Sequence, residues 1–261
     1  MKKIIIALLF IVTVSFDSQR EDAFEVGELF KFRIHYGILN AGYVTVEVKD
    51  AVISNKKVFH VIGKGYTTGM SRFFFKVDDL YESYFDKETG IPYQFVRKID
   101  EGGYTKNQEG FFSHTENKIF VKDYKNKTQK TLEIPKNSQD ILSAFYYLRN
   151  HPNIDKLVPG ESVVIDMFFD DETTKFKLKF LGREDITTKF GVIPSMIFRP
   201  LVQSGRVFKE EESLTVWVSD DNNKLPLRIK ASLAVGSIKA DLDAFKGLKY
   251  SFKVKNKKTF D

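Results

Sequence analysis

The chain has 261 residues, a formal charge of +6 and a hydrophobic fraction of 42% that includes 25 phenylalanines and 11 tyrosines. This composition excludes an intrinsically disordered chain, because such chains are poor in aromatic residues, and the small, dispersed positive charge gives no support for a nucleic-acid partner. The sequence has no cysteine, which excludes disulfides and the cysteine-linked lipid of a bacterial lipoprotein.

The beginning of the chain, residues 1–18, has the layout of a secretory signal peptide. Lys2 and Lys3 precede an almost continuous apolar stretch over residues 4–14, and small residues near Ser15 and Ser18 suit cleavage. A permanent membrane anchor is the alternative, but the stretch is shorter than the ~20 residues that a spanning helix needs. We therefore expect cleavage, a periplasmic or otherwise extracytoplasmic location, and no remaining membrane span.

The mature chain, residues 19–261, is predicted to form a single β-rich domain that starts with a β-half over residues 27–134. Residues 28–36 and 43–48 alternate in polarity around a turn, which indicates a β-hairpin. A third strand follows at 57–66, where Gly63 and Gly65 predict a bend or bulge. Further strands are predicted at residues 73–77, 81–85, 93–100, 104–112, 118–124 and 128–134.

One helix is predicted, over residues 138–150. Ser138 or Asp140 can cap its first turn. Arg149 suits the negative end of the helix dipole, so its loss should destabilise the fold far less than the loss of Phe145. Helical spacing places four apolar side chains on one face, which we expect to cover the concave side of the sheet: Ile141, Leu142, Phe145 and Leu148.

A second β-half is predicted over residues 161–255. Its strands are expected at residues 162–169, 175–181, 182–190, 191–200, 213–218, 225–232, 236–243 and 248–254. The whole chain then has about fifteen strands at regular spacing, a pattern typical of antiparallel sandwiches and barrels. The predicted fold is therefore mainly β: a large curved antiparallel sheet or barrel-like sandwich with one internal helix.

The densest aromatic stretch is the candidate ligand site. Phe73, Phe74 and Phe75 follow one another between Arg72 and Lys76. In a strand, Phe73 and Phe75 share one face and Phe74 takes the other, so either both faces are buried or one lines an apolar groove. The groove hypothesis takes Phe73, Phe74, Phe75, Tyr81 and Phe145 as lining residues, with Arg72 and Lys76 as contacts for a lipid headgroup.

No catalytic, cofactor-binding or metal-binding residues are assigned. The four histidines have no ligand spacing, and the acidic turn at 220–223 lacks the ligand order of a calcium loop. Asp78, Asp79, Glu82 and Glu101 could supply the paired carboxylates of a glycosidase, although sequence alone does not place any two of them face to face.

Four blocks of sequence, taken in order, carry a resemblance to a known family: GELFKFRIHYGILNAGYVTVEV, FFFKVDDLYESYFDKETGIPYQFVRKIDEGG, DILSAFYYLR and VWVSDDNNKLPLRIKASLAVGSIKADL. Together they resemble Domain of Unknown Function family 3108 over residues 27–242. The resemblance implies an exported bacterial β-rich protein with no established activity. The inferred shape is also similar to the periplasmic lipoprotein carriers LolA and LolB, although this chain has only one clear helix.

We therefore expect a cell-envelope protein that acts by binding rather than by catalysis. Its expected partner is a lipid, another apolar or amphipathic envelope component, or an envelope protein. Two alternatives stay open at this point: an envelope hydrolase acting on glycan or lipid, and a structural or interaction scaffold. The oligomeric state is open as well.

Overall fold

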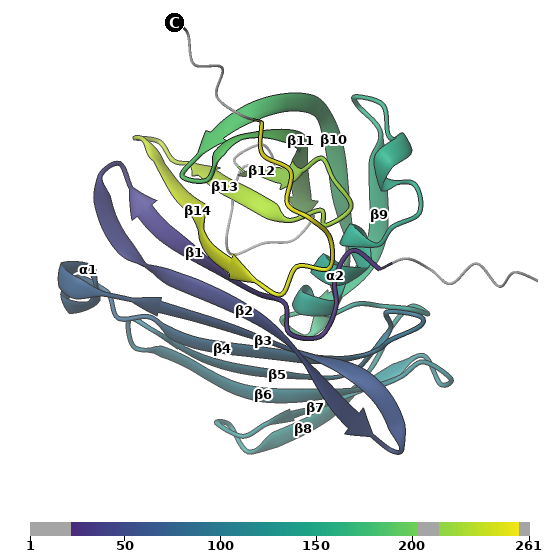
Figure 1. Cartoon of the computed structure of the whole chain (residues 1–261). Coiled ribbons are helices and arrows are strands. Elements are labelled where there is room, and N and C mark those ends of the chain that lie inside the picture. Colours follow the sequence, from purple (N-terminus) through teal and green to yellow (C-terminus); the bar gives the residue numbers. More distant parts are fainter. Residues whose placement is uncertain (1–21, 203–213, 256–261) are drawn as a thin grey trace, which may run out of the picture.

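The computed structural model describes residues 22–202 and 214–255, which form one antiparallel sheet of 14 strands around an internal helix (Figure 1). The predicted signal peptide, residues 1–18, lies outside the described residues. The chain enters at the middle of the sheet and builds one half outward to the edge. The elements of this half are β1 (Leu29–Tyr36), β2 (Leu39–Ile53), β3 (Lys56–Thr67), α1 (Gly69–Phe74), β4 (Asp78–Asp86), β5 (Pro92–Glu101), β6 (Tyr104–Ser113), β7 (Lys118–Asp123) and β8 (Thr128–Glu133).

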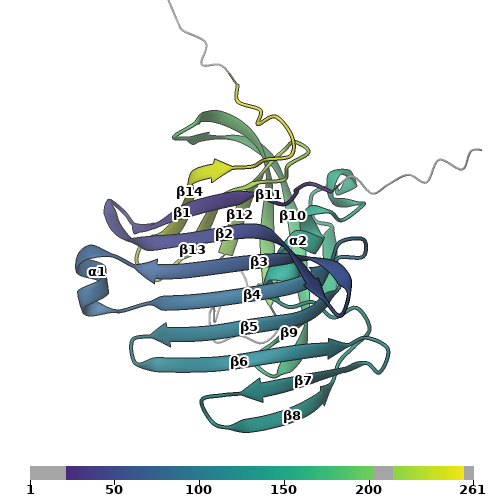
Figure 2. The same ribbon diagram turned by 60° about the horizontal axis from the view of Figure 1, so that its bottom comes forward.

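The chain then crosses to the opposite edge of the sheet through α2 (Ile141–Arg149) and returns strand by strand to the middle, where β14 pairs with β1. Figure 2 shows β1 to β8 side by side in one half of the sheet. The elements of the returning half are η1 (Ile154–Lys156), β9 (Ser162–Phe169), β10 (Glu172–Thr188), β11 (Gly191–Val202), β12 (Leu214–Ser219), β13 (Pro226–Ser232) and β14 (Ser237–Lys246).

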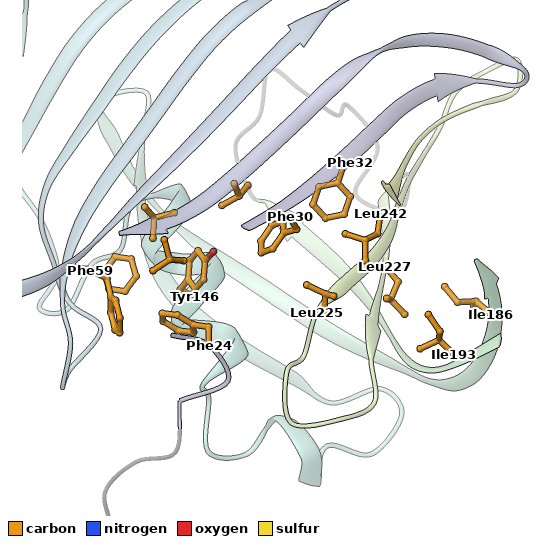
Figure 3. Close-up of a cluster of buried hydrophobic side chains, with 14 residues drawn as sticks. Phe24, Phe30, Phe32, Phe59, Tyr146, Ile186, Ile193, Leu225, Leu227 and Leu242 are labelled. Carbon is orange, nitrogen blue, oxygen red and sulfur yellow. The ribbon is translucent and has the colours of Figure 1, made fainter. Parts of the chain in front are cut away.

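Alternation along the strands gives the sheet an apolar inner face. Phe30 and Phe32 of β1 are buried, as are Leu227 of β13 and Leu242 of β14. The same cluster extends to Phe59 of β3, so the main core draws on both halves (Figure 3). Since the sheet curves, the inner faces of its two halves enclose α2 between them (Figure 1).

Helix α2 is capped as its sequence predicts. The Asp140 side chain accepts hydrogen bonds from the backbone N–H groups of Leu142 and Ser143, and the Ser143 hydroxyl accepts one from the Asp140 N–H. This reciprocal pair satisfies groups that a helix start leaves unpaired. Leu142 packs on the main core, while Leu148 belongs to a second cluster between α2 and β9–β11. The helix therefore joins two cores rather than covering one.

Four predicted strands need correction. Residues 73–77 do not form a strand, because the chain turns at Gly69 (φ +55°) into the short helix α1, which leaves Phe73–Phe75 exposed. Residues 248–254 are also not a strand: they leave the sheet after Gly247 (φ +66°), and Phe252 packs back on the core. Residues 175–181 and 182–190 are parts of one long strand, β10, whose register shifts at Gly182.

Gly63 and Gly65 of β3 do not form the predicted bulge. Neither pairing of β3 shows a register shift. A Cβ atom at Gly63 would lie 3.5 Å from the Leu142 side chain, and one at Gly65 would lie 3.6 Å from Val44. Both distances are ordinary van der Waals contacts, so close packing does not require a glycine at either position.

The expectation that Arg149 is peripheral and Phe145 buried is reversed. Arg149 is only 5% exposed and forms an ion pair with Glu28, which is fully buried. Phe145 is only partly buried, and its neighbour Tyr146 takes the central core position. The reason is a partner 121 residues earlier in the chain, which helical periodicity does not reveal.

Candidate functional site

An apolar cavity of about 360 Å³ lies between α2 and strands β9–β13. This volume falls within the about 300–1,000 Å³ of typical ligand pockets. Helix α2 forms its floor with Ala144, Phe145 and Leu148, and the curled sheet forms its wall with Met167, Phe176, Leu178, Phe198, Pro200, Leu214, Val216, Val218, Pro226 and Ile229. We call this opening the inner cavity.

The inner cavity follows from the strand pattern. The register places Leu178 of β10 opposite Pro200 of β11, and Phe198 of β11 opposite Val216 of β12. Every second residue of these strands faces inward, and the small residue Ala144 on α2 keeps the helix from filling the space. The result is a wall that is almost entirely hydrocarbon.

Two cations border the inner cavity, and each has a carboxylate partner. Arg149 Nη1 lies 2.6 Å from Glu28 Oε1, and Lys224 Nζ lies 2.9 Å from Asp155 Oδ1. Since these charges are compensated, the inner cavity suits the apolar part of a ligand better than an isolated charged group.

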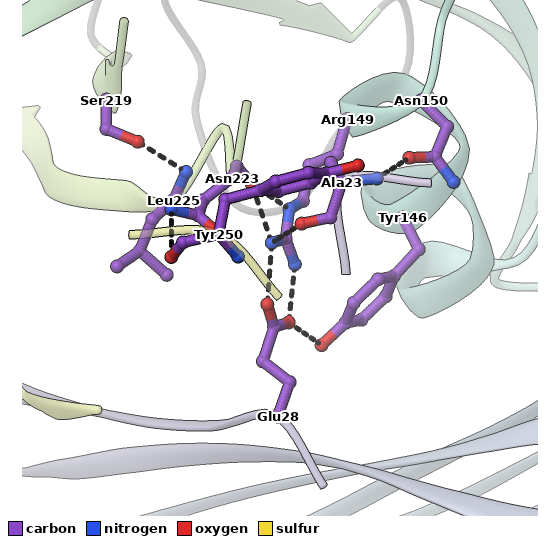
Figure 4. Close-up of polar contacts among 9 residues, drawn as sticks. All are labelled: Ala23, Glu28, Tyr146, Arg149, Asn150, Ser219, Asn223, Leu225 and Tyr250. Atoms are coloured by element: carbon purple, nitrogen blue, oxygen red, sulfur yellow. Dashed lines mark hydrogen bonds and ion pairs between the residues drawn. The ribbon is translucent and has the colours of Figure 1, made fainter. Parts of the chain in front are cut away.

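A buried polar network surrounds Arg149, which lines the inner cavity (Figure 4). Both terminal nitrogens of Arg149 donate to Glu28, and the guanidinium also donates to the carbonyl oxygen of Asn223. Burial lowers the pKa of Arg149, but the neighbouring Glu28 carboxylate outweighs it, so the pKa ends above its usual value. The hydroxyl of Tyr146 donates to Glu28 at 3.2 Å, and burial raises the pKa of Tyr146. The network thus ties β1, α2 and the β12–β13 turn together.

A second opening, beside Tyr81, is much smaller at about 30 Å³. It is bordered by Arg97, whose guanidinium lies 4.2 Å from the ring centre of Phe169 and 2.5 Å from Asp170 Oδ1. Arg97 also lies near Asp79, which with Glu101 belongs to the carboxylates that a glycosidase could use.

Asp79 and Glu101 do approach each other, which the sequence left open. Partial burial and a hydrogen bond with Glu101 raise the pKa of Asp79 to about 7, although the backbone N–H of Asp100 also donates to Asp79. Neither residue lines the inner cavity or the small opening beside Tyr81.

The structure does not bring the predicted groove residues together. Phe145 lines the inner cavity, and Tyr81 borders the separate small opening. Phe73, Phe74 and Phe75 lie on and just after α1, exposed to solvent.

The proposed headgroup contacts are also already engaged. Arg72 donates two hydrogen bonds to Asp78, at 2.7 and 2.9 Å, and Lys76 lies 2.5 Å from Asp100.

Sequence reasoning did not identify the inner-cavity residues of β10–β12, because in the sequence they look like ordinary inward-facing strand positions. No local signal shows whether such positions pack tightly or leave a space.

Within residues 22–202 and 214–255, no group of three or more histidine, aspartate or glutamate side chains is placed to hold a metal ion. The helices of the same residues are all too short or too polar to cross a membrane.

Comparison with known proteins supports the fold and leaves the ligand unnamed. A family model described as a protein of unknown function, DUF3108, matches residues 31–243. A β-barrel-like protein of domain of unknown function DUF1849 from Brucella abortus has 11% sequence identity and a TM-score of 0.57, with 85% of this chain and 98% of that chain covered. A candidate lipoprotein from Parabacteroides distasonis has 12% identity and a TM-score of 0.34, with coverage of 86% and 98%. No curated protein matches the sequence.

Proposed function

Since the chain belongs to the DUF3108 family of proteins of unknown function, we propose its role from the geometry: it is a non-catalytic cell-envelope protein that holds the apolar part of a lipid-like ligand in the inner cavity. The observation that carries this proposal is the inner cavity itself. It is large enough for a ligand, has apolar walls, and has charged neighbours that are already neutralised.

The structure of the cavity wall explains why an acyl chain is the favoured ligand. A hydrocarbon chain needs no hydrogen-bond partners and gains about 0.8 kcal/mol for each CH₂ group removed from water. Aliphatic residues such as Leu178, Val216 and Ile229 offer contacts along its length without demanding one fixed orientation. A sugar would instead require several polar groups directed into the cavity.

The hydrolase alternative has one supporting observation, the proximity of Asp79 and Glu101. A glycosidase needs its two carboxyl groups about 5–9.5 Å apart across a bound sugar, whereas these two share a hydrogen bond and lie outside both openings described above. We therefore place the binding function first.

The proposal can be tested by placing larger side chains at two wall positions, so that they occupy the inner cavity. Val216 and Ile229 are partners across β12 and β13, and both line the cavity. We expect the double variant Val216→Phe/Ile229→Phe to raise the dissociation constant of a fluorescent fatty acid at least about tenfold, or ~1.4 kcal/mol. Fluorescence titration gives the constant, and thermal melting shows whether the variant is folded.

Val164→Phe is the matched control, since Val164 on β9 is exposed and does not line the cavity. It should bind the fatty acid as the wild type does. Wild-type protein that fails to bind the fatty acid, or a folded double variant that binds it unchanged, would contradict the proposal.

We also propose that the protein is exported with cleavage of residues 1–18. The proposal is based on the signal-like sequence of these residues and on Phe24, a buried core residue that follows shortly after them. N-terminal sequencing of protein from a cell-envelope fraction should then find a start near residues 16–19. An intact Met1 would point to a retained anchor.

A further inference from the structure

Three chain connections at one end of the molecule carry exposed apolar side chains. Ile38 in the β1–β2 turn is 97% exposed, Phe73 on α1 is 87% exposed, and Val235 in the β13–β14 turn is 77% exposed. Large apolar side chains occur singly on most protein surfaces, but contiguous groups of them mark interaction sites. We call these three connections the apolar rim.

The apolar rim is one continuous structure. The backbone N–H of Thr68, the residue before α1, donates to the carbonyl oxygen of Ala41 beside the β1–β2 turn. Tyr36, at the end of β1, donates from its hydroxyl to the carbonyl oxygen of Val235 at 3.0 Å. Figure 1 shows α1, the β1–β2 turn and the β13–β14 turn at the same end of the sheet, on the left.

The charges beside two of the three connections of the apolar rim favour an anionic surface, whereas Arg72 and Lys76 beside α1 are paired with Asp78 and Asp100. The β1–β2 turn (residues 36–42) and the β13–β14 turn (residues 232–238) contain no charged residue. Behind them, on the outer face, Lys230 of β13 and Lys239 of β14 are direct cross-strand partners. Like charges in this position repel each other.

Counter-charges for these lysines are scarce. Arg33 of β1 is exposed on this face and the two lysines are half-buried, and among the described residues none of the three forms an ion pair. The nearest carboxylate along the strands, Asp241, is already bound by His35 and Arg228. A phosphate-bearing surface that met the apolar rim would supply the missing negative charge.

We infer that the apolar rim docks on an anionic lipid membrane, with Ile38, Phe73 and Val235 entering the interface and Lys230 and Lys239 meeting lipid phosphates. This inference deepens the proposed function and rests on it, because the rim lies along the way to the inner cavity. On β13, Ile229 lines the cavity, Ala231 shares its face, and the exposed turn residue Leu233 follows. A lipid leaving a membrane at the rim would meet an apolar path inward.

The experiment is co-sedimentation of the folded protein with vesicles of phosphatidylcholine containing about a quarter phosphatidylglycerol. Ile38→Ser/Phe73→Ser should reduce the bound fraction strongly, with an apparent binding constant lowered at least about tenfold, because two large apolar side chains no longer leave water. Val52→Ser/Val158→Ser is the matched control, since both valines are exposed away from the rim, and it should bind as the wild type does.

A second pair of variants tests the charges. Lys230→Gln/Lys239→Gln should weaken binding to the anionic vesicles by roughly fivefold for each lysine and leave binding to pure phosphatidylcholine vesicles unchanged. Each variant is also titrated with the fluorescent fatty acid in the absence of vesicles. The rim variants should keep the wild-type affinity there, so a failure of membrane docking is distinguishable from a failure of the inner cavity.

Two outcomes would overturn the inference. The first is wild-type protein that stays in the supernatant with both kinds of vesicle. The second is wild-type protein that is dimeric in light scattering and becomes monomeric in Ile38→Ser/Phe73→Ser without a change in vesicle binding, which would show that a second copy of the chain covers the rim.

Discussion

Arg149 illustrates at the residue scale how one buried cation organises this fold. Its guanidinium meets Glu28 through two hydrogen bonds, of 2.6 and 2.7 Å, in a region that excludes water. Removing one member of such a pair leaves the other charge buried and uncompensated. We expect Arg149→Met and Glu28→Leu each to lower the free energy of unfolding by about 3–5 kcal/mol.

The double variant Arg149→Met/Glu28→Leu provides the contrast, since it leaves no buried charge and should recover much of that loss. Urea denaturation of the four proteins gives the coupling energy. Phe145→Ala should cost less than Arg149→Met, because Phe145 already borders an open space. A small effect of Arg149→Met alone would mean that the pair is solvated and does not join the halves.

Asp140 makes stability depend on pH. Burial raises the pKa of Asp140 to about 6, and the hydrogen bonds from Ser83 and the helix backbone only partly oppose this. In the unfolded chain the carboxyl ionises near pH 3.8, while the folded chain holds its proton up to about pH 6. The contribution of protonated Asp140 to the free energy of unfolding is therefore fully present below pH 3.8. It is lost as the pH rises to about 6, a change of about 3 kcal/mol.

Asp140→Asn should abolish this change, since an amide oxygen still caps α2 but does not ionise. The measurement is the difference in free energy of unfolding between wild type and variant at several pH values, which cancels the opposite contributions of salt-bridged carboxyls such as Asp170. A difference that stays constant between pH 4 and about 7 would contradict the raised pKa of Asp140.

Gly42 tests the strand packing at the scale of the elements. A Cβ atom on Gly42 of β2 would lie 2.2 Å from the carbonyl oxygen of Tyr66 on β3, so the two strands would have to separate. Gly42→Ala should cost about 1–3 kcal/mol, as other overpacked sites do. Gly65→Ala is the control, because its Cβ would meet Val44 at an ordinary 3.6 Å. Equal denaturation midpoints for both variants would mean that β2 and β3 can move apart freely.

The sequence predicted elements that depend on neighbouring residues in the chain. Period-two alternation identified most strands, and Asp140 together with the apolar spacing identified α2. The sequence-based prediction failed where contacts between distant segments determine the structure. Phe73–Phe75 has a strand-like composition but belongs to a connection beside the β1–β2 turn. The inner cavity could not be predicted, because unfilled space depends on how far α2 stands from β10–β12.

At the scale of the whole molecule, the two β-halves share one sheet and one main core. The main core combines Phe59 and Val61 of β3 with Leu225 and Leu227 near β13. The segment before β1 is also bound to the end of α2 and to the segment after β14. The Ala23 N–H donates to Asn150, and the Asp22 carbonyl oxygen accepts a hydrogen bond from Lys249. Destabilising either half should therefore destabilise the other.

Trp217 on β12 allows a direct test, because it is the only tryptophan of the chain and its fluorescence reports on the second half alone. Val61→Ala removes buried methyl groups from β3 in the first half and should cost on the order of 2 kcal/mol. If the halves unfold together, the urea midpoint measured by Trp217 fluorescence must fall by as much as the midpoint measured by far-ultraviolet circular dichroism. Met196→Ala, a buried change in β11, should likewise move both midpoints together. A Trp217 midpoint that stays in place while circular dichroism splits into two transitions would show that β1–β8 unfold separately, and α2 would then be a linker rather than a shared core.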